Sequence, residues 1–498
     1  MPEISLTPQM LDRFISRFGK EKIAVLHSKL SIGEKYDEWD KIKTKKAKIV
    51  IGARSAIFAP VEDLGIIIID EEHDSSYKSE SNPKYDAKQV AKYIAKQNKC
   101  PLLLGSATPD LKEYYKAKEL GQIELLELTK RANEASLPKV TIIDLKEELA
   151  SGNKSMLSRE LYKSIEENLK NKKQTILFLN RRGYSTFVMC RNCGYVAKCK
   201  NCNISLTYHS YEKKLKCHYC GYEENLVNIC PECGSDKIRY FGTGTQKLEQ
   251  EIQKEFPNAS TIRMDVDTVS KKNSHEEILN KFKEDNIDIL IGTQMVVKGH
   301  HFPNVTLVGV ITADSSLNID DYRANERTFD ILTQVAGRAG REKDKPGKVI
   351  IQTYNPDNFT IECSREQNYK KFYETEILIR KQLKYPPFCD IIVIGFSGLK
   401  EEKLIDISKK TYNYLKQKLE IIEKDEEIKQ EQEGTIKIFK PMPAPIDKIQ
   451  NRYRYRIIIK GKINEKINDV LNEYLQKVYQ KDLKDIRISI DVNPNNMA

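Results

Sequence analysis

Eight of the eleven cysteines lie in one short segment of the chain. They form four C-x2-C pairs separated by 5, 14 and 9 residues: Cys190/Cys193, Cys199/Cys202, Cys217/Cys220 and Cys230/Cys233. Such pairs supply thiolates to tetrahedral zinc, and four thiolates close a site completely, leaving no position for a substrate. The sequence therefore predicts two structural zinc ions per chain.

The four pairs can combine in three ways. Joining the first two directly leaves only five residues between them, which is cramped, whereas the inner two pairs give C-x2-C-x14-C-x2-C, close to the usual zinc-ribbon spacing. The favoured arrangement is therefore nested. It places Cys190, Cys193, Cys230 and Cys233 on one ion, and Cys199, Cys202, Cys217 and Cys220 on the other.

An acidic group ends an apolar run in the first quarter of the chain. Residues 65–73 read GIIIIDEEH, and GSATP follows at 105–109 after a helix-sized interval. Hydrolysis of a nucleoside triphosphate needs one carboxylate for Mg²⁺ and a second to position and deprotonate water. The pair Asp70 and Glu71 suits that chemistry.

A second charged motif lies at residues 334–341, which read QVAGRAGR. It is expected to place Gln334, Arg338 and Arg341 on a short loop-to-helix segment. Guanidinium groups at this spacing can stabilise the negative charge that develops on a γ-phosphoryl group during its transfer.

The elements that position these motifs read as alternating short apolar strands and helices, the pattern of a parallel sheet with crossover helices. Strands of a first group are expected at 22–26, 47–51, 66–70 and 101–104, and of a second group at 141–144, 175–179, 261–265, 287–292, 305–311 and 348–353, with helices at 158–170 and 274–284. The predicted fold class is α/β, with two tandem sheets and the cysteine segment inserted in the second.

A third unit follows the second sheet. Strands at 391–396, 453–459 and 486–492 and helices at 404–423 and 464–479 predict a small α+β domain. The expected domains are 1–138, 139–385 with the insert 190–233, and 386–498. Arg452 and Arg454 alternate with tyrosines, a pattern that suits either DNA binding or an edge strand kept charged against aggregation.

Composition excludes several classes. With 498 residues, 39% hydrophobic residues and mean hydropathy −0.57, the chain is neither disordered nor membrane-spanning. Its start, MPEISLTPQM, has no secretory pattern, so a cytoplasmic location is expected. The net charge of +11 permits nucleic acid as a partner.

The motifs together resemble the PriA-type replication restart helicases (the primosomal protein N′ family) of superfamily 2. The resemblance runs along almost the whole chain through PEISLTPQM (2–10), IGARSAIFAP (51–60), DEEHDSSYK (70–78), LGSATPD (104–110), FLNRRGY (178–184), the eight cysteines, IGTQMVVKGHHFPNVTLVGV (291–310), ERTFDILTQVAGRAGR (326–341) and PMPAPIDKIQNRYRYR (441–456). It implies two RecA-like lobes, ATP with Mg²⁺, and 3′-to-5′ unwinding at stalled forks. It also implies forked and single-stranded DNA, primosome proteins and single-strand-binding protein as partners of a monomer.

The resemblance assigns roles by position. It makes Asp70 and Glu71 the Mg²⁺ and water-activating pair, His73 a coupling residue, and Gln334, Arg338 and Arg341 the group that meets the γ-phosphate. Further residues are assigned to nucleotide contact (Gly299 and Gly337) and to DNA contact (Arg54, Ser55, Thr293, Gln294, Lys298, Arg452 and Arg454).

One departure concerns the phosphate-binding loop. The pattern G-x-x-x-x-G-K-[ST] does not occur in the sequence, although the family carries it shortly before the segment that matches Pro2. We therefore expect a first lobe truncated at its N-terminus and a chain that does not turn over ATP by itself. The alternatives are a non-hydrolysing fragment that binds forked DNA, or a zinc-ribbon scaffold for protein interactions.

Overall fold

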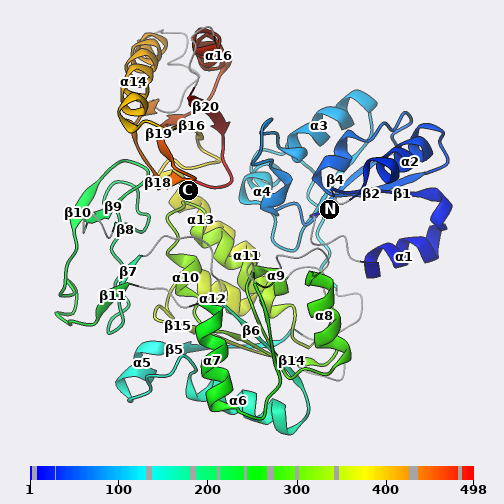
Figure 1. Ribbon diagram of the computed structural model, residues 1–498, viewed down its shortest axis with the longest axis vertical. Helices are drawn as coiled ribbons and strands as arrows, with labels where there is room; N and C mark the ends of the chain where they lie inside the picture. Colours follow the sequence, from blue (N-terminus) through cyan, green and yellow to red (C-terminus); the bar gives the residue numbers. More distant parts are fainter. Residues whose placement is uncertain are drawn as a thin grey trace.

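The computed structural model shows two α/β lobes, a β-rich insert beside the second lobe, and a C-terminal domain above them (Figure 1). It describes residues 1–2, 8–28, 30–130, 137–179, 187–209, 214–240, 244–265, 268, 274–297, 302–340, 347–424, 436–479 and 485–497. Among these residues, no helix combines the length and the apolar character needed to cross a bilayer.

The second lobe is built on a six-stranded parallel sheet of order β12-β13-β6-β14-β15-β5. Its strands are β5 (Lys139–Asp144), β6 (Gln174–Phe178), β12 (Thr261–Met264), β13 (Ile289–Gly292), β14 (Val305–Val310) and β15 (Lys348–Thr353). Its helices are α5 (Leu145–Ala150), α6 (Arg159–Lys170), α7 (Thr245–Glu255), α8 (Ser274–Glu284), α9 (Gln294–Val297), α10 (Asp314–Leu317), α11 (Ala324–Ala336), α12 (Phe359–Glu366) and α13 (Tyr369–Gln382). All six strands expected in this region are present.

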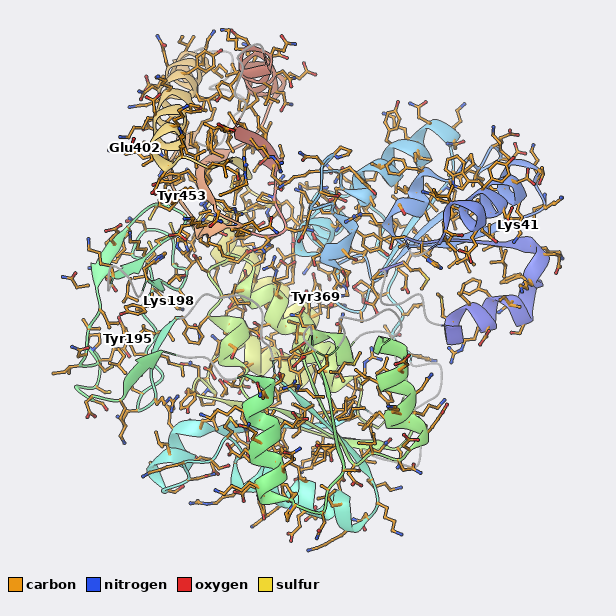
Figure 2. All side chains as sticks on the ribbon, in the orientation of Figure 1. Lys41, Tyr195, Lys198, Tyr369, Glu402 and Tyr453 are labelled. Atoms are coloured by element: carbon orange, nitrogen blue, oxygen red, sulfur yellow. The ribbon has the colours of Figure 1, made fainter. Side chains whose placement is uncertain are left out.

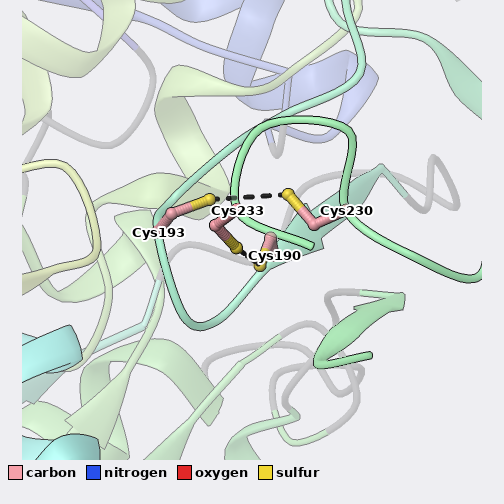
Figure 3. A group of neighbouring side chains, drawn as sticks. All are labelled: Cys190, Cys193, Cys230 and Cys233. Carbon is pink, nitrogen blue, oxygen red and sulfur yellow. Dashed lines mark hydrogen bonds between the residues drawn. The ribbon is translucent and has the colours of Figure 1, made fainter. Parts of the chain in front are cut away.

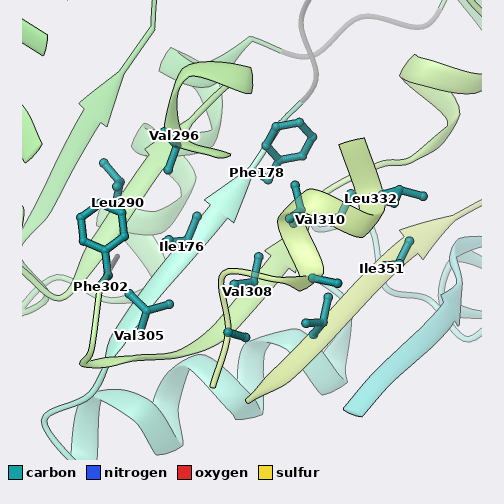
Figure 4. Close-up of a cluster of buried hydrophobic side chains, with 14 of the residues drawn as sticks. Ile176, Phe178, Leu290, Val296, Phe302, Val305, Val308, Val310, Leu332 and Ile351 are labelled. Atoms are coloured by element: carbon teal, nitrogen blue, oxygen red, sulfur yellow. The ribbon is translucent and has the colours of Figure 1, made fainter. Parts of the chain in front are cut away.

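Both faces of this sheet are covered, which explains why its strands are apolar without interruption. Along β6, Ile176 and Phe178 enter a core shared with Val308 and Leu332 (Figure 4), while Leu177 faces the helices α6 and α7 on the other side. Each such buried side chain contributes about 1.5–3 kcal/mol relative to an exposed one. This core holds the carboxyl ends of the strands in place.

The first lobe differs from the expectation of one sheet. Its elements are α1 (Pro8–Phe18), β1 (Ile23–Leu26), α2 (Ile32–Lys43), β2 (Ile49–Gly52), β3 (Ile67–Asp70), α3 (Ala87–Asn98), β4 (Leu102–Gly105) and α4 (Leu111–Lys118). The strands form two separate parallel pairs, β1-β2 and β3-β4, because no described strand lies between them. Ile68 is consequently 57% exposed on the open face of β3.

The cysteine insert consists of short antiparallel strands in two small sheets, β10-β9-β8 and β11-β7. These are β7 (Val188–Cys190), β8 (Thr207–His209), β9 (Lys214–Lys216), β10 (Glu223–Asn225) and β11 (Ile238–Tyr240). Its core continues into the C-terminal domain through Tyr385, Ile391 and Ile458, so the insert packs on a folded neighbour.

The C-terminal domain is the expected layer of helices on an antiparallel sheet. It contains β16 (Asp390–Gly398), α14 (Glu401–Lys424), β17 (Lys437–Ile438), β18 (Met442–Ile449), β19 (Arg452–Gly461), α16 (Glu465–Tyr479) and β20 (Ile486–Val492). The sheet order is β17-β19-β16-β20, and β18 also pairs with β19. The sequence did not predict β18 because its two prolines, Pro443 and Pro445, argue against a strand interior; it is tolerated where it pairs on one side only.

Candidate zinc sites and interlobe site

The eight cysteines form two groups of four, and the nested pairing is confirmed. In one group Cys190 Sγ lies 3.7 Å from Cys233 Sγ, and Cys193 Sγ lies 3.5 Å from Cys230 Sγ (Figure 3). The second group contains Cys199, Cys202, Cys217 and Cys220. Tetrahedral zinc with Zn–S bonds of about 2.3 Å separates its sulfurs by about 3.8 Å, so both groups fit the ion.

Each C-x2-C pair is closed by the same backbone turn. The residue after the second cysteine has a positive φ: Gly194 (82°), Asn203 (56°), Gly221 (75°) and Gly234 (66°). Its N–H donates to the carbonyl oxygen of the first cysteine, at 2.8 to 3.0 Å. Glycine and asparagine tolerate this left-handed conformation, so these residue types hold the sulfurs of each pair on one side.

The thiols of the first group have shifted pKa values. The backbone hydrogen bond from Ser235 lowers the pKa of Cys233 to about 7. Burial, with contacts to Cys233 and Cys230 and against a backbone hydrogen bond from Tyr195, raises the pKa of Cys193 to about 12, so Cys193 by itself favours the protonated thiol. A divalent ion reverses this preference, because thiolates are its ligands.

Histidines of the insert serve as neighbours of the zinc groups. His218 Nδ1 lies 2.6 Å from Asp320 Oδ2 of the second lobe, and His218 Nε2 lies 2.8 Å from His209 Nε2. Tyr385 donates to the carbonyl oxygen of Cys202 at 3.0 Å. These contacts fix the insert against the second lobe and the start of the C-terminal domain.

The acidic motif lies at the carboxyl end of β3, as expected. Asp70 ends the strand opposite Gly105 of β4, and the following Glu71 has a positive φ of 48°. The Glu71 side chain is 39% exposed, whereas the next carboxyl, Glu72, is 2% exposed. The turn therefore presents Asp70 and Glu71 outward, where a metal ion and water can reach them.

Glu72 is a buried structural acid. Its Oε1 accepts from the backbone N–H of Asp110 at 2.6 Å, and its Oε2 lies 3.0 Å from Lys88 Nζ. Burial raises the pKa of Glu72 to about 7 against the opposing effect of Lys88. One lysine faces two carboxyls here, since Lys88 also lies 3.4 Å from Asp110 Oδ2.

His73 joins the two lobes. Its Nδ1 lies 2.6 Å from Ser106 Oγ at the end of β4, and its Nε2 lies 2.7 Å from Gln334 Nε2 on α11. The lobes also meet where Leu111 N–H donates to Glu326 Oε1 at 2.8 Å. Tyr369, near the centre of Figure 2, donates to the carbonyl oxygen of Pro109 at 2.6 Å.

The QVAGRAGR segment runs in the opposite order to that expected. Gln334 belongs to the last turn of α11, Gly337 is the residue that ends this helix, and Arg338 follows in a turn. The segment is therefore helix-to-loop, because residues from Ala324 onward already bury a helical stripe against the sheet. Arg341 lies outside the described residues.

A third motif lies at the end of β13. A Cβ on Gly292 would come within 2.9 Å of the Met264 carbonyl oxygen, so glycine is required there. Thr293, which is 9% exposed, follows it, and Gln294 begins α9 and lines the interlobe cavity. Lys298 and Gly299 lie outside the described residues.

Two groups of expected DNA contacts have protein partners in this structure. Arg54 donates to the carbonyl oxygens of Ser76 and Lys78 at 3.0 and 2.9 Å, and the adjoining Ser55 is exposed. In β19, Arg452 donates to the Ser397 carbonyl oxygen at 3.1 Å and Arg454 to that of Ile446 at 3.3 Å. A role in DNA binding for these residues stays a prediction.

A cavity of about 290 Å³ lies between the lobes and the end of the chain. Its lining includes His73, Gln294, Gln334, Arg323 and Asn495, so it adjoins the contact that joins the lobes.

Four family models match parts of the chain. They are DEAD/DEAH box helicase (residues 1–117), PriA DNA helicase Cys-rich region (CRR) domain (199–224), Helicase conserved C-terminal domain (224–343) and Primosomal protein N C-terminal domain (381–495). They agree with two helicase lobes, a zinc insert and a separate C-terminal domain.

Curated relatives match over most of the chain. Replication restart protein PriA of Bacillus subtilis (strain 168) is 49% identical, covering 100% of this chain and 60% of the relative. The protein of the same name from Rickettsia felis is 39% identical, covering 92% of this chain and 68% of the relative. The chain belongs to the PriA family of replication restart proteins. The protein of the same name from Synechocystis is 44% identical over 92% of this chain. The chain spans 60% of the length of the Bacillus subtilis relative and 54% of the length of the Synechocystis relative.

Likeness to solved structures is weaker. Mss116p bound to single-stranded RNA and AMP-PNP gives a TM-score of 0.42 at 14% identity, covering 74% of this chain and 60% of that one. The family assignment therefore rests on the sequence matches.

Family membership settles the resident metal. The PriA Cys-rich model and the two four-cysteine groups establish two zinc ions per chain, and the helicase models imply ATP with Mg²⁺. The exposed carboxylates of Asp70 and Glu71 are of the type that would hold Mg²⁺, which would offset charge on the phosphates when bound.

Some residues of the site were missed by the sequence reasoning. The acidic motif is contacted from segments 15 to 40 residues away by Ser106, Lys88 and Asp110. The SATPD motif gave a signal for Ser106 and Asp110, and none pointed to Lys88. No sequence signal pointed to Asn495.

Proposed function

We propose that this chain supplies the motor lobes, zinc insert and C-terminal domain of an ATP-driven 3′-to-5′ DNA helicase of replication restart. The observation that carries the proposal is the position of His73 between Ser106 of the first lobe and Gln334 of the second. A change at the nucleotide would move both partners, so nucleotide state and lobe arrangement are linked. The domain limits 1–138, 139–385 and 386–498 are part of this proposal.

The proposed roles of the site residues follow from their positions. Asp70 holds the metal ion, and Glu71 orients the attacking water from an exposed position at the strand end. Arg338, with Arg341, neutralises charge on the γ-phosphate, and Gly337 contacts the nucleotide. Thr293 and Gln294 at the end of β13 contact the DNA backbone together with Lys298, and Gly299 contacts the nucleotide.

The proposed substrates are forked and single-stranded DNA, held mainly through phosphates. The proposed protein partners are primosome proteins and single-strand-binding protein, met by a monomer in the cytoplasm. These follow from the family, whose curated members carry the name replication restart protein.

A second candidate function is DNA binding without hydrolysis. The absence of G-x-x-x-x-G-K-[ST] from the 498 residues favours it for this polypeptide by itself, because backbone N–H groups and the lysine of that loop provide most phosphate contacts.

The two candidates are separated by an unwinding assay. A duplex with a 3′ single-stranded tail is compared with one carrying a 5′ tail, using this chain and a version extended upstream to include the phosphate loop. We expect both chains to bind both substrates, and only the extended chain to unwind the 3′-tailed duplex with ATP. Unwinding of the 5′-tailed duplex alone would contradict the proposed direction.

A further inference from the structure

The end of the chain crosses from the C-terminal sheet to both lobes. We call residues 491–497 the tail segment. Asp491 pairs with Lys78 and Lys84 of the first lobe at 2.8 and 2.7 Å, and Met497 is 2% exposed in the core shared with the zinc insert. The tail segment is thus held at both ends, with its middle beside the interlobe cavity.

Asn495 makes the central contacts of this segment. Its carbonyl oxygen accepts hydrogen bonds from Arg323, at 2.6 Å, and from Arg327. Its side-chain amide donates to the carbonyl oxygen of Ser75 in the first lobe. Asn495 therefore touches both lobes. Its contact in the first lobe, Ser75, lies two positions after His73. Its contact Arg327 in the second lobe lies on α11, the helix that carries Gln334.

The two arginines beside Asn495 share one acid. Arg323 and Arg327 both pair with Asp321, at 3.0 and 3.2 Å. Although burial opposes it, these two arginines lower the pKa of Asp321 to about 2, so this acid stays ionised. The two guanidinium groups thus share one carboxylate, and the carbonyl oxygen of Asn495 that accepts from both of them is neutral.

The arginines are also held in place before any ligand arrives. Arg323 makes two contacts with Asp321, through Nε at 3.1 Å and Nη2 at 3.0 Å, and lies over the Tyr322 ring at 4.9 Å from its centroid. Guanidinium groups fixed in this way present their remaining N–H groups in a set direction. Hydrogen bonds from such groups to a charged oxygen are about twice as strong as those to a neutral one.

We propose that Arg323 and Arg327 form a phosphate-binding site that the carbonyl oxygen of Asn495 occupies in this structure. A phosphate oxygen would replace that carbonyl, and the tail segment would leave the cavity beside it. The phosphate belongs either to a DNA strand, in which case the site rests on the proposed function, or to a free phosphate-bearing ligand. Since Ser75 follows His73 by two residues, release of the tail segment would also loosen the loop that joins the lobes.

The test combines two changes. The full chain and a chain ending at Pro494 are each made with Arg327 and with Arg327→Gln, and Arg487→Gln, an exposed arginine of β20, is the matched charge control. Affinity for a 20-nucleotide oligo(dT) is measured by fluorescence anisotropy over a range of salt. Binding of inorganic pyrophosphate is measured by calorimetry.

We expect the shortened chain to bind its phosphate ligand about fivefold more tightly than the full chain, with Arg327→Gln removing that gain. In the full chain Arg327→Gln is expected to change affinity less than about twofold, because Asn495 already occupies the site. If DNA is the ligand, Arg327→Gln in the shortened chain also reduces the salt slope by about 0.7. Arg487→Gln leaves the gain intact.

A second variant controls for the loss of the buried Met497 in the shortened chain. Asn495→Gly keeps Met497 but removes the amide that holds the tail segment to Ser75, and is compared with and without Arg327→Gln. A gain in affinity that depends on Arg327, in the shortened chain or in Asn495→Gly, supports the site. The absence of such a gain from both of these chains overturns it. An effect with oligo(dT) alone identifies a DNA strand, and one with pyrophosphate identifies a free ligand. If no form binds DNA, the proposed function fails while the pyrophosphate result still decides the site.

Discussion

His73 and Gln334 meet across the lobe interface, with 2.7 Å between His73 Nε2 and Gln334 Nε2. On the other side of the ring, His73 Nδ1 lies 2.6 Å from Ser106 Oγ and 3.6 Å from Glu71 Oε2. A single imidazole thereby contacts the end of β4 in one lobe and the end of α11 in the other.

This contact predicts a loss of coupling rather than of chemistry. In the extended chain, His73→Ala and Gln334→Ala should each lower the stimulation of ATP hydrolysis by DNA about tenfold. The double variant should be no worse than either, because both remove one interaction. Phosphate release with and without forked DNA measures the ratio. Gln253→Ala, an exposed glutamine of the same lobe, is the control, and additive losses in the double variant would argue against a shared contact.

Metal content tests the zinc pairing. The purified chain should contain two zinc ions, and Cys199→Ser and Cys193→Ser should each contain one, since each group has four sulfurs and no spare ligand. The double variant Cys199→Ser/Cys217→Ser should retain one ion, whereas Cys199→Ser/Cys193→Ser should retain none. Elemental analysis after reducing purification gives these counts.

The control for these variants is Cys100→Ser, a cysteine outside both groups, which should keep both ions. Retention of one ion by Cys199→Ser/Cys193→Ser would show that these residues share a site and that the nested pairing is wrong.

The second lobe and the zinc groups could be predicted because their signals are local. Its strands are continuous apolar runs such as Ile289–Gly292, and cysteine spacing alone favoured the pairing that the structure confirms. The turn that closes each pair was not predicted, although Gly194, Gly221 and Gly234 each follow a second cysteine.

The remaining features depend on contacts between distant segments. Nothing near Asn495 indicates that it lies beside Ser75, 420 residues earlier. Arg454 resembled a phosphate contact, but whether a cation faces solvent or a carbonyl is decided by the neighbouring strand, here β18. The sequence analysis assigned roles to Asp70 and Glu71 and none to Glu72, whose burial cannot be read from three consecutive acids.

Glu72 gives a prediction about pH. Its folded pKa of about 7 lies above the ordinary value of 4.5, so the protonated form is favoured by folding. Its stabilising contribution is complete below pH 4.5 and is lost as pH rises through 7, on the order of 3 kcal/mol in total. Glu72→Gln, which stays neutral, should flatten the decline of Tm between pH 5 and 8, as followed by calorimetry. Glu80→Gln, an exposed acid of the same lobe, should not; a parallel decline in Glu72→Gln would refute this account.

The last prediction separates the three acids by function. In the extended chain Glu71→Gln should abolish hydrolysis while sparing ATP binding, since Glu71 is the exposed acid that orients water. Arg341→Ala should slow hydrolysis about 10³-fold or more. Glu72→Gln is the matched control, and should keep hydrolysis within about threefold because its carboxyl is buried against Lys88 and the Asp110 N–H. Phosphate release and nucleotide binding are measured on all four chains. Turnover by Glu71→Gln together with its loss in Glu72→Gln would assign the catalytic carboxylate to Glu72 instead.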